Sequence, residues 1–160
     1  MIIAITGASG VGKTFTLKQI SHKLNAQCFH FDDISMPNWD EVDSKEWQKE
    51  TTIKWIDKLV EVSINENVNI IFEGSTEFKF FIQGFEKNKF LDYQLLLFDC
   101  SKGTMKNRLI KREQAELYTQ KMENWLRYLR REAIKLDIEI IRTDLLTMEE
   151  IEQIFINKVM

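Results

Sequence analysis

The sequence predicts an α/β domain in which helices cover both faces of a five-stranded parallel sheet. Five short apolar segments are typical of strands buried on both faces. Stretches of helical periodicity lie between them, and strands that alternate with helices along a chain form parallel sheets. The 160 residues are the length of one domain, 1–160, with a sizeable core.

The predicted elements follow one another from the first residue. Strands are expected at 1–6, 27–31, 68–73, 93–98 and 138–141. Apolar residues three or four apart predict helices over 17–24, 47–63, 116–136 and 148–159. Thr147 and Glu150 predict a capping box at the start of the last helix, and Asp43 with Glu46 offers another.

Composition and charge narrow the function classes. The formal net charge of −3 does not favour polyanions, so nucleic acid is not an expected partner. No apolar run approaches the ~18 residues of a membrane span, and no signal-peptide pattern precedes the first strand. We therefore expect a cytoplasmic protein without membrane contact, as a monomer or homodimer. Cys28 and Cys100 lack metal-ligand spacing and are interpreted as reduced core thiols.

A glycine-bearing loop joins the first strand to the first helix and matches G-x-x-x-x-G-K-[ST] without a gap. Its residues are Gly7, Ala8, Ser9, Gly10, Val11, Gly12, Lys13 and Thr14. Glycines let backbone N–H groups converge on a phosphate, and the helix start adds its own N–H groups and dipole. Lys13 suits the β- and γ-phosphates, and the Thr14 hydroxyl suits Mg²⁺. The chain here resembles the Walker A proteins, which implies that 7–14 bind a nucleoside triphosphate with Mg²⁺.

Further segments are similar to small P-loop kinases, most closely the group of uridine kinase and nicotinamide riboside kinase. "FDDI" (31–34) resembles the Asp-Asp-Phe after their second strand, and "IIFEGS" (70–75) resembles their apolar strand ending in Glu-Gly. "DCSKGTMKNRLIKR" (99–112) looks like the strand, acid and arginine-bearing lid of the wider superfamily. The resemblance implies a P-loop NTPase three-layer sandwich with a five-stranded parallel sheet and a short helical lid near 109–121.

Acids follow the predicted strands, where ligands of such sheets bind. A carboxylate after the second strand would take a proton from the acceptor hydroxyl or hold the metal. We favour Asp32 as the catalytic residue, because it follows the strand directly, and assign Asp33 to the metal. Glu73 closes a buried strand, where an acid needs a partner; in the resembling kinases this glutamate acts on the metal or as the base. The alternatives are turn or cap roles for the aspartates and a structural ion pair for Glu73.

Arg108 and Arg112 lie four residues apart and hence on one helical face. A guanidinium can stack on adenine or bind phosphate oxygens. The resemblance implies that both arginines close over the triphosphate and stabilise charge in the transition state, with Arg108 also contacting the nucleotide. The alternative is a solvated basic face.

Other basic residues are interpreted without a functional role. A solvated position is favoured for Arg127, Arg130 and Arg131. His22 and His30 have neither a nucleophile nor a metal partner nearby in sequence, and both are interpreted as structural.

The acceptor is expected to be a small molecule. Kinases that act on nucleoside monophosphates hold the acceptor phosphate with arginines, and residues 1–107 contain none. The segment after the second strand is instead rich in acids and tryptophans, among which Trp39 is the better ligand candidate and Trp47 and Trp55 suit packing. This favours a neutral or cationic hydroxyl compound that is nucleoside-like, although lysines in the same segment also suit phosphate. A sugar or antibiotic derivative is the alternative.

These observations predict an ATP-dependent phosphotransferase that moves the γ-phosphoryl group of ATP·Mg²⁺ to a hydroxyl of a small molecule. The Asp-x-x-Gly and Asn/Thr-Lys-x-Asp motifs of GTPases are missing, since "FEGST" and "FDCSK" stand in their places. Two alternatives remain at this point: a nucleotide-binding regulatory ATPase and a nucleoside monophosphate kinase. A binder without turnover is disfavoured by the acids at the strand ends.

Overall fold

The computed structural model describes residues 1–33 and 44–160, and its sheet confirms the predicted fold class. Five parallel strands pair in the order β2-β3-β1-β4-β5. Their bounds are Ile2–Thr6 (β1), Gln27–His30 (β2), Ile70–Glu73 (β3), Tyr93–Asp99 (β4) and Glu139–Arg142 (β5). Each strand begins and ends within two residues of the range that the sequence predicts.

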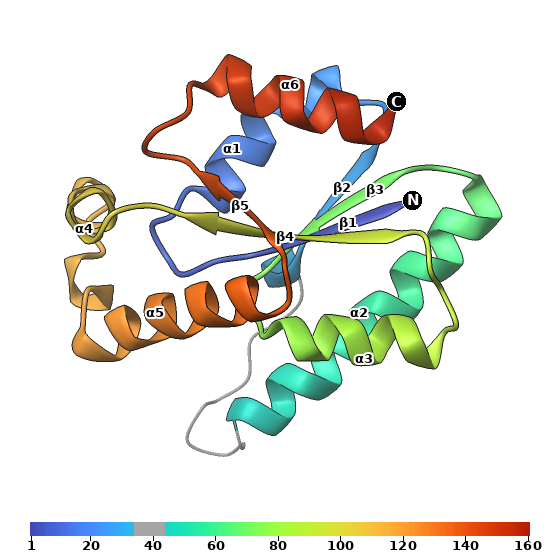
Figure 1. The fold of residues 1–160 in the computed structure, drawn as a ribbon, viewed down its shortest axis with the longest axis horizontal. Coiled ribbons are helices and arrows are strands. Elements are labelled where there is room, and N and C mark those ends of the chain that lie inside the picture. Colours follow the sequence, from blue (N-terminus) through green and yellow to red (C-terminus); the bar gives the residue numbers. More distant parts are fainter. Residues whose placement is uncertain (34–43) are drawn as a thin grey trace.

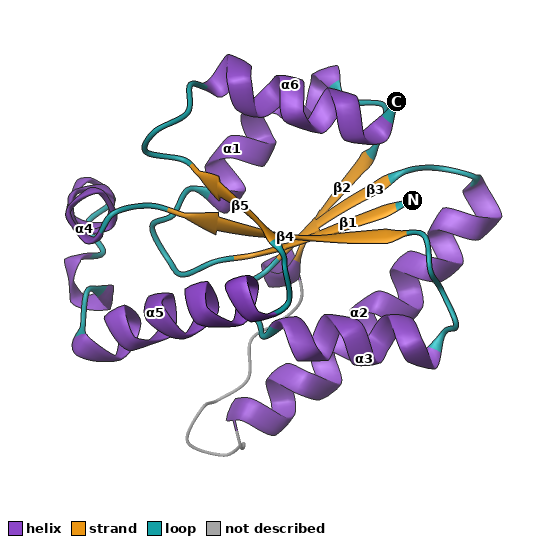
Figure 2. Ribbon diagram, viewed as in Figure 1, coloured by secondary structure: helices purple, strands orange, loops and turns teal. Residues whose placement is uncertain are grey.

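Helices cover both faces of the sheet and complete the three layers (Figures 1 and 2). Their bounds are Lys13–Ile20 (α1), Ser44–Glu66 (α2), Phe78–Lys87 (α3), Lys102–Lys111 (α4), Gln120–Lys135 (α5) and Met148–Val159 (α6). Short 3₁₀ turns lie at Ser21–Lys23, Phe31–Asp33 and Ala115–Leu117. Helices α1 and α6 lie on one face, whereas α2, α3 and α5 lie on the other.

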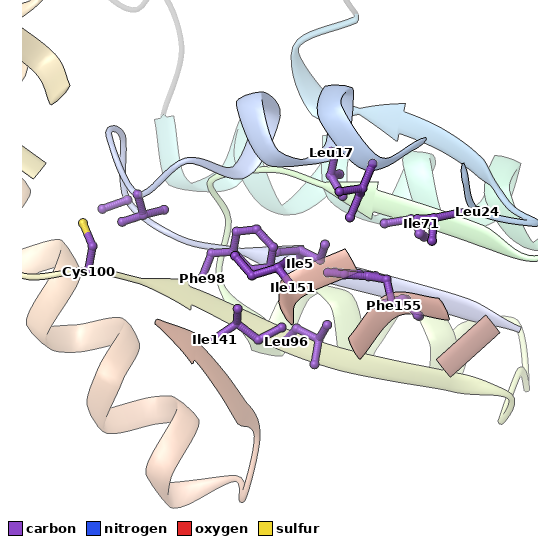
Figure 3. Close-up of a cluster of buried hydrophobic side chains, with 14 of the residues drawn as sticks. Ile5, Leu17, Leu24, Ile71, Leu96, Phe98, Cys100, Ile141, Ile151 and Phe155 are labelled. Carbon is purple, nitrogen blue, oxygen red and sulfur yellow. The ribbon is translucent and has the colours of Figure 1, made fainter. Parts of the chain in front are cut away.

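The side chains of β1 point alternately to the two faces of the sheet and so contribute to both apolar layers. Ile3 and Ile5 pack with α1 and α6, whereas Ile2 and Ala4 pack with α2, α3 and α5. Figure 3 shows the first layer, in which Phe155 of α6 lies near Phe98 of β4, with ring centroids 6.1 Å apart. Two packed faces fix the strands on both sides and hold the loops at their carboxyl ends in place.

Two helix boundaries have clear chemical causes. Thr147 and Glu150 form the predicted capping box at the start of α6. Helix α5 begins at Gln120 rather than near 116, because the Thr119 side chain accepts a hydrogen bond from the Met122 backbone N–H and caps it there. Asp43 of the other predicted capping box lies outside the described residues, as do Trp39 and the acids at 40 and 41.

Helix α3 was not predicted from the sequence, although Phe78, Phe81 and Phe85 have the spacing of one helical face. All three side chains are buried against β1 and β3 together with Trp55 of α2, which confirms the packing interpretation of that tryptophan. A buried aromatic face of this kind contributes several kcal/mol to folding, about 1.5–3 kcal/mol per side chain.

Candidate nucleotide-binding and phosphoryl-transfer site

Residues 7–14 form a tight loop at the carboxyl end of the central strand β1. Gly10 and Gly12 adopt φ angles of 86° and 94°, which favour glycine. A Cβ on Gly7 would lie 2.6 Å from the Phe98 carbonyl oxygen, so this glycine lets the loop pass close to β4. Helix α1 starts directly at Lys13, and its first N–H groups therefore point into the loop, as a phosphate-binding loop requires.

Lys13 lies across this loop. Its Nζ donates hydrogen bonds to the carbonyl oxygens of Gly7 at 2.6 Å and Ala8 at 3.1 Å. Burial lowers the pKa of Lys13, while the nearby carboxylates of Glu73 and Asp32 act in the opposite direction. The ammonium group is thus held next to two acids, at the place where phosphate charge would accumulate.

Thr14, Glu73 and His30 meet at one carboxylate oxygen. Thr14 Oγ1 donates to Glu73 Oε1 at 2.7 Å, and His30 Nδ1 lies 2.8 Å from the same oxygen. Glu73 is only 4% exposed, and His30 is its register partner between β2 and β3. The sheet register therefore sets this contact. It could not be predicted from the sequence, because the order of strands in the sheet was not known.

The oxygen groups of this cluster suit Mg²⁺. Among the described residues no group of three or more His, Cys, Asp or Glu side chains could hold a metal. Mg²⁺ commonly uses one or two protein oxygens and completes its shell with phosphate and water, and Thr14 with Glu73 offers that set. Asp32 lines the same cavity. Asp33 does not, and its carboxylate accepts a hydrogen bond from the His30 backbone N–H at 3.1 Å.

The two predicted lid arginines are placed differently. Arg108 Nη1 donates to the Val11 carbonyl at 3.1 Å and to Thr143 Oγ1 at 2.8 Å, and Nη2 donates to the Thr143 carbonyl at 3.1 Å. Arg108 therefore braces the phosphate loop against the segment after β5. Arg112 is exposed, and its side chain makes no hydrogen bond or ion pair within residues 1–33 and 44–160, which leaves its charge available to a ligand.

Three adjoining cavities surround the loop. The first, about 340 Å³, is mainly apolar and lies between the loop and α6. The second, about 300 Å³, is polar and contains Lys13, Thr14, Asp32 and Glu73. The third, about 750 Å³, lies between the start of α2, the segment that precedes α3, and α5. The first two cavities share Gly10, Gly12, Phe15 and Arg112, and the last two share Ser9, Ser75 and Leu117.

The two outer cavities are lined by different side chains. Leu146, Met148 and Ile151 supply apolar surface to the first, together with Phe15, whose side chain is exposed. The third is lined by hydroxyl, amide, aromatic and charged groups: Ser44, Lys45, Gln48, Glu77, Glu116, Thr119, Lys121, Met122, Asn124, Trp125 and Tyr128, beside the three shared residues. A flat apolar group fits the first cavity. The third cavity also presents mainly apolar surface, but hydroxyl, amide and charged groups are set into it.

The interpretation of Arg130 as solvated is wrong. Its guanidinium makes a bidentate ion pair with Asp99, at 2.7 and 3.0 Å, and also donates to the Cys100 carbonyl at 2.8 Å. Arg127 and Arg131, in contrast, are exposed as expected. Arg130 therefore fixes α5, one wall of the third cavity, to the end of β4.

The interpretation of the two cysteines as core thiols is confirmed for Cys100 and only in part for Cys28. This side chain is buried, whereas Cys28 is half-buried, and both thiols are free. Across the described ranges, no helix has the length and apolar character that crossing a bilayer would take.

The sheet order, the loop at 7–14 and the acid that ends β3 define a P-loop nucleotide-binding protein. The model of the AAA_18 family, an AAA domain, matches residues 3–139. The match covers most of the chain, which therefore belongs to this family. No curated protein matches the chain by sequence.

Solved structures with the same fold include several kinases. A gluconokinase from Sinorhizobium meliloti 1021 aligns with a TM-score of 0.70 and 13% identity, over 98% of this chain and 90% of that chain. A sugar kinase from Janibacter sp. HTCC2649 aligns at 0.58 and 17%, over 98% and 90%. A deoxyadenosine kinase from M. mycoides with bound dATP aligns at 0.55 and 20%, over 96% and 97%. At these identities, the likeness establishes the fold.

Proposed function

We propose that this chain is an ATP-dependent kinase that transfers the γ-phosphoryl group of ATP·Mg²⁺ to a hydroxyl of a small molecule. The observation that carries the proposal is the row of three adjoining cavities with the Lys13, Thr14 and Glu73 cluster in the middle one. A phosphotransferase needs two substrates that meet at the transferring group, and this row offers one cavity on each side of that point.

The first cavity suits the nucleotide base and the second suits its phosphates. The apolar surface of Leu146, Met148 and Ile151 matches a flat purine, and the backbone of 7–14 matches the phosphate chain. Lys13 and Arg112 would offset the charge that develops on the transferring phosphoryl group. In this proposal Arg108 acts on the nucleotide through the loop that it braces.

Thr14 and Glu73 would hold the Mg²⁺ ion, which offsets charge on the phosphate oxygens when it is bound. Asp32 lines the phosphate cavity, and its side chain makes no hydrogen bond or ion pair within residues 1–33 and 44–160. We therefore assign it to orient or deprotonate the acceptor hydroxyl. Asp33, which the sequence assigned to the metal, does not line this cavity, and its carboxylate accepts a hydrogen bond from the His30 backbone N–H. Closure of the segment 109–121 over the site would exclude water and limit hydrolysis, because Arg112, Gln114 and Leu117 already line the cavity.

The third cavity suits the acceptor, and its chemistry favours a nucleoside-like or other small hydroxyl compound. No arginine lies among its lining residues in the described part of the chain, which argues against a phosphorylated acceptor. We place the reaction in the cytoplasm, where ATP and Mg²⁺ are supplied, and propose a monomer or homodimer.

The test is ADP release measured with and without candidate acceptors: deoxynucleosides, nucleoside monophosphates, D-gluconate, neutral sugars and aminoglycosides. A kinase shows release that one acceptor class stimulates many-fold, whereas a regulatory ATPase shows slow release that none stimulates. Lys13→Met should abolish the stimulated rate. Lys18→Met, an exposed lysine on the same helix, is the matched control and should leave the rate unchanged.

A further inference from the structure

Glu77 is the deeply buried acid of the third cavity, and the reaction proposed above does not use it. It is 6% exposed and stands at the N-cap position of α3, yet its side chain makes no capping hydrogen bond. Instead, Oε2 accepts a hydrogen bond from Tyr128 at 3.1 Å and pairs with Lys79 at 2.8 Å. Oε1 forms an ion pair with the Lys45 ammonium group at 3.6 Å, and its remaining lone pairs can accept a hydrogen bond from a ligand.

The position of Glu77 is fixed relative to the phosphate loop. Thr6, the last residue of β1, donates from Oγ1 to the Thr76 carbonyl at 2.6 Å. The Thr76 N–H donates back to Thr6 Oγ1 at 3.1 Å, and Thr76 Oγ1 lies 2.8 Å from Thr52 Oγ1. All three threonines are buried. The residue before Glu77 is thus fastened to the residue before Gly7, so both substrate sites share one rigid support.

The opposite wall presents an aromatic surface. Trp125 and Tyr128 of α5 stack with ring centroids 5.6 Å apart and an interplanar angle of 19°. Both line the cavity together with Gln48 and Asn124. Hydroxyl-bearing rings are commonly held in this way, with an aromatic face against the ring and carboxylate or amide groups on its hydroxyls.

The charges of the lining residues balance. Lys45 and Lys121 carry two positive charges, and Glu77 and Glu116 carry two negative ones. Lys79 pairs with Glu77 from outside this lining. An ionised carboxylate only accepts hydrogen bonds, so Glu77 favours hydroxyl or amino donors on a ligand. A lining whose charges balance offers no excess of positive charge to a phosphate or carboxylate group.

We propose that Glu77, held by Tyr128, selects a neutral acceptor over an anionic one by accepting hydrogen bonds from its hydroxyl or amino groups. The shared chemistry is a neutral ring compound with several hydroxyls, which a nucleoside or an unmodified sugar both supply. This inference rests on the kinase function proposed above and adds the substrate class.

The experiment is calorimetric binding to the full chain saturated with a non-hydrolysable ATP analogue and Mg²⁺. The probes are deoxyadenosine and deoxycytidine as nucleosides, D-ribose and D-glucose as neutral sugars, and D-gluconate and AMP as anions. We expect a neutral probe to bind at least about tenfold more tightly than either anion. Comparison of the nucleosides with the neutral sugars then shows which of the two classes supplies the ring that binds.

Three variants distinguish a role of Glu77 in ligand binding from an effect on folding. Glu77→Gln should weaken the neutral probe about tenfold and leave the affinity for the ATP analogue unchanged. Tyr128→Phe should weaken binding of the neutral probe by a smaller factor. If Glu77→Gln does not fold, this second variant still tests the proposal. Glu86→Gln, an exposed acid on the same helix, is the matched control and should change neither affinity.

The outcomes distinguish this inference from the kinase proposal. If D-gluconate or AMP binds best, if both variants bind like the wild type, or if no neutral probe binds, the inference is overturned. Phosphoryl transfer to D-gluconate or AMP would overturn it while the kinase function stands. A bound neutral probe that is never phosphorylated would overturn the kinase function instead.

Discussion

The imidazole of His30 lies 2.8 Å from Glu73 Oε1, the oxygen that also accepts the Thr14 hydroxyl at 2.7 Å. The parallel register of β2 and β3 places His30 directly beside Glu73. Because Glu73 is buried at the end of its strand, these two donors define where its carboxylate sits. His30 therefore positions the carboxylate that the proposed reaction assigns to Mg²⁺.

Replacing His30 with Asn should make the Glu73 carboxylate less well ordered and lower the affinity of the site for Mg²⁺. Loss of a group that orients a metal ligand commonly costs about 10–100-fold in metal affinity or activity. Calorimetry of ATP-analogue binding at increasing Mg²⁺ concentrations measures this change independently of turnover. His22→Asn, an exposed histidine away from the site, is the control, and an unaltered Mg²⁺ requirement in the His30 variant would refute the positioning role.

Arg108 and Arg112 should give different kinetic signatures. Arg108 holds the carbonyl groups of the loop, so Arg108→Met should disturb nucleotide binding and raise the KM for ATP roughly tenfold. Arg112 lines the phosphate cavity with its side chain available, so Arg112→Met should lower kcat, by about 10²-fold or more, with a smaller change in KM. Steady-state kinetics of both variants test this, and equal effects on KM and kcat would contradict it.

Arg130 should matter for stability. Arg130→Met leaves the Asp99 carboxylate, 4% exposed, without its guanidinium partner, which should lower the free energy of unfolding by about 2–4 kcal/mol. Urea denaturation measures the loss. The neighbouring exposed Arg131→Met should stay within about 0.5 kcal/mol of the wild type. Equal stabilities for the two variants would mean that the ion pair with Asp99 does not hold α5 to the sheet.

The Cys100 thiol should be inert in the folded protein. Burial raises its pKa to about 11, with smaller and opposing effects from Arg108 and Asp144. At pH 8 only about one thiol in a thousand is therefore ionised. In a Cys28→Ser variant, labelling by a thiol reagent should be slow, rise with pH up to about 11 and become fast in urea. Fast labelling of the folded variant at pH 8 would show that the thiol is accessible.

The sequence was sufficient for most of the fold. Buried parallel strands are short runs of apolar residues, so β1, β3 and β4 were recognisable without any knowledge of their neighbours. The loop at 7–14 was equally clear, because its glycines and Lys13 follow a fixed spacing. Helix α3 lies between the predicted strands at 68–73 and 93–98, a stretch for which no element was predicted although its phenylalanines have helical spacing.

The rest of the site depends on contacts between distant segments. His30 meets Glu73 only through the pairing of β2 with β3, and Arg130 meets Asp99 only through the packing of α5 on the sheet. Arg108 lies on the expected helical face, but its contact with Thr143, which follows the last strand, could not be predicted from spacing. Periodicity and spacing describe single elements, so they did not reveal these pairs.

The most direct test of the account is to follow the γ-phosphate of labelled ATP in the presence of Mg²⁺ and the acceptor panel. We expect the label to appear on a small-molecule hydroxyl with the wild type and with Lys18→Met, but not with Lys13→Met. Label that is recovered only as inorganic phosphate, with every acceptor, would contradict the central claim.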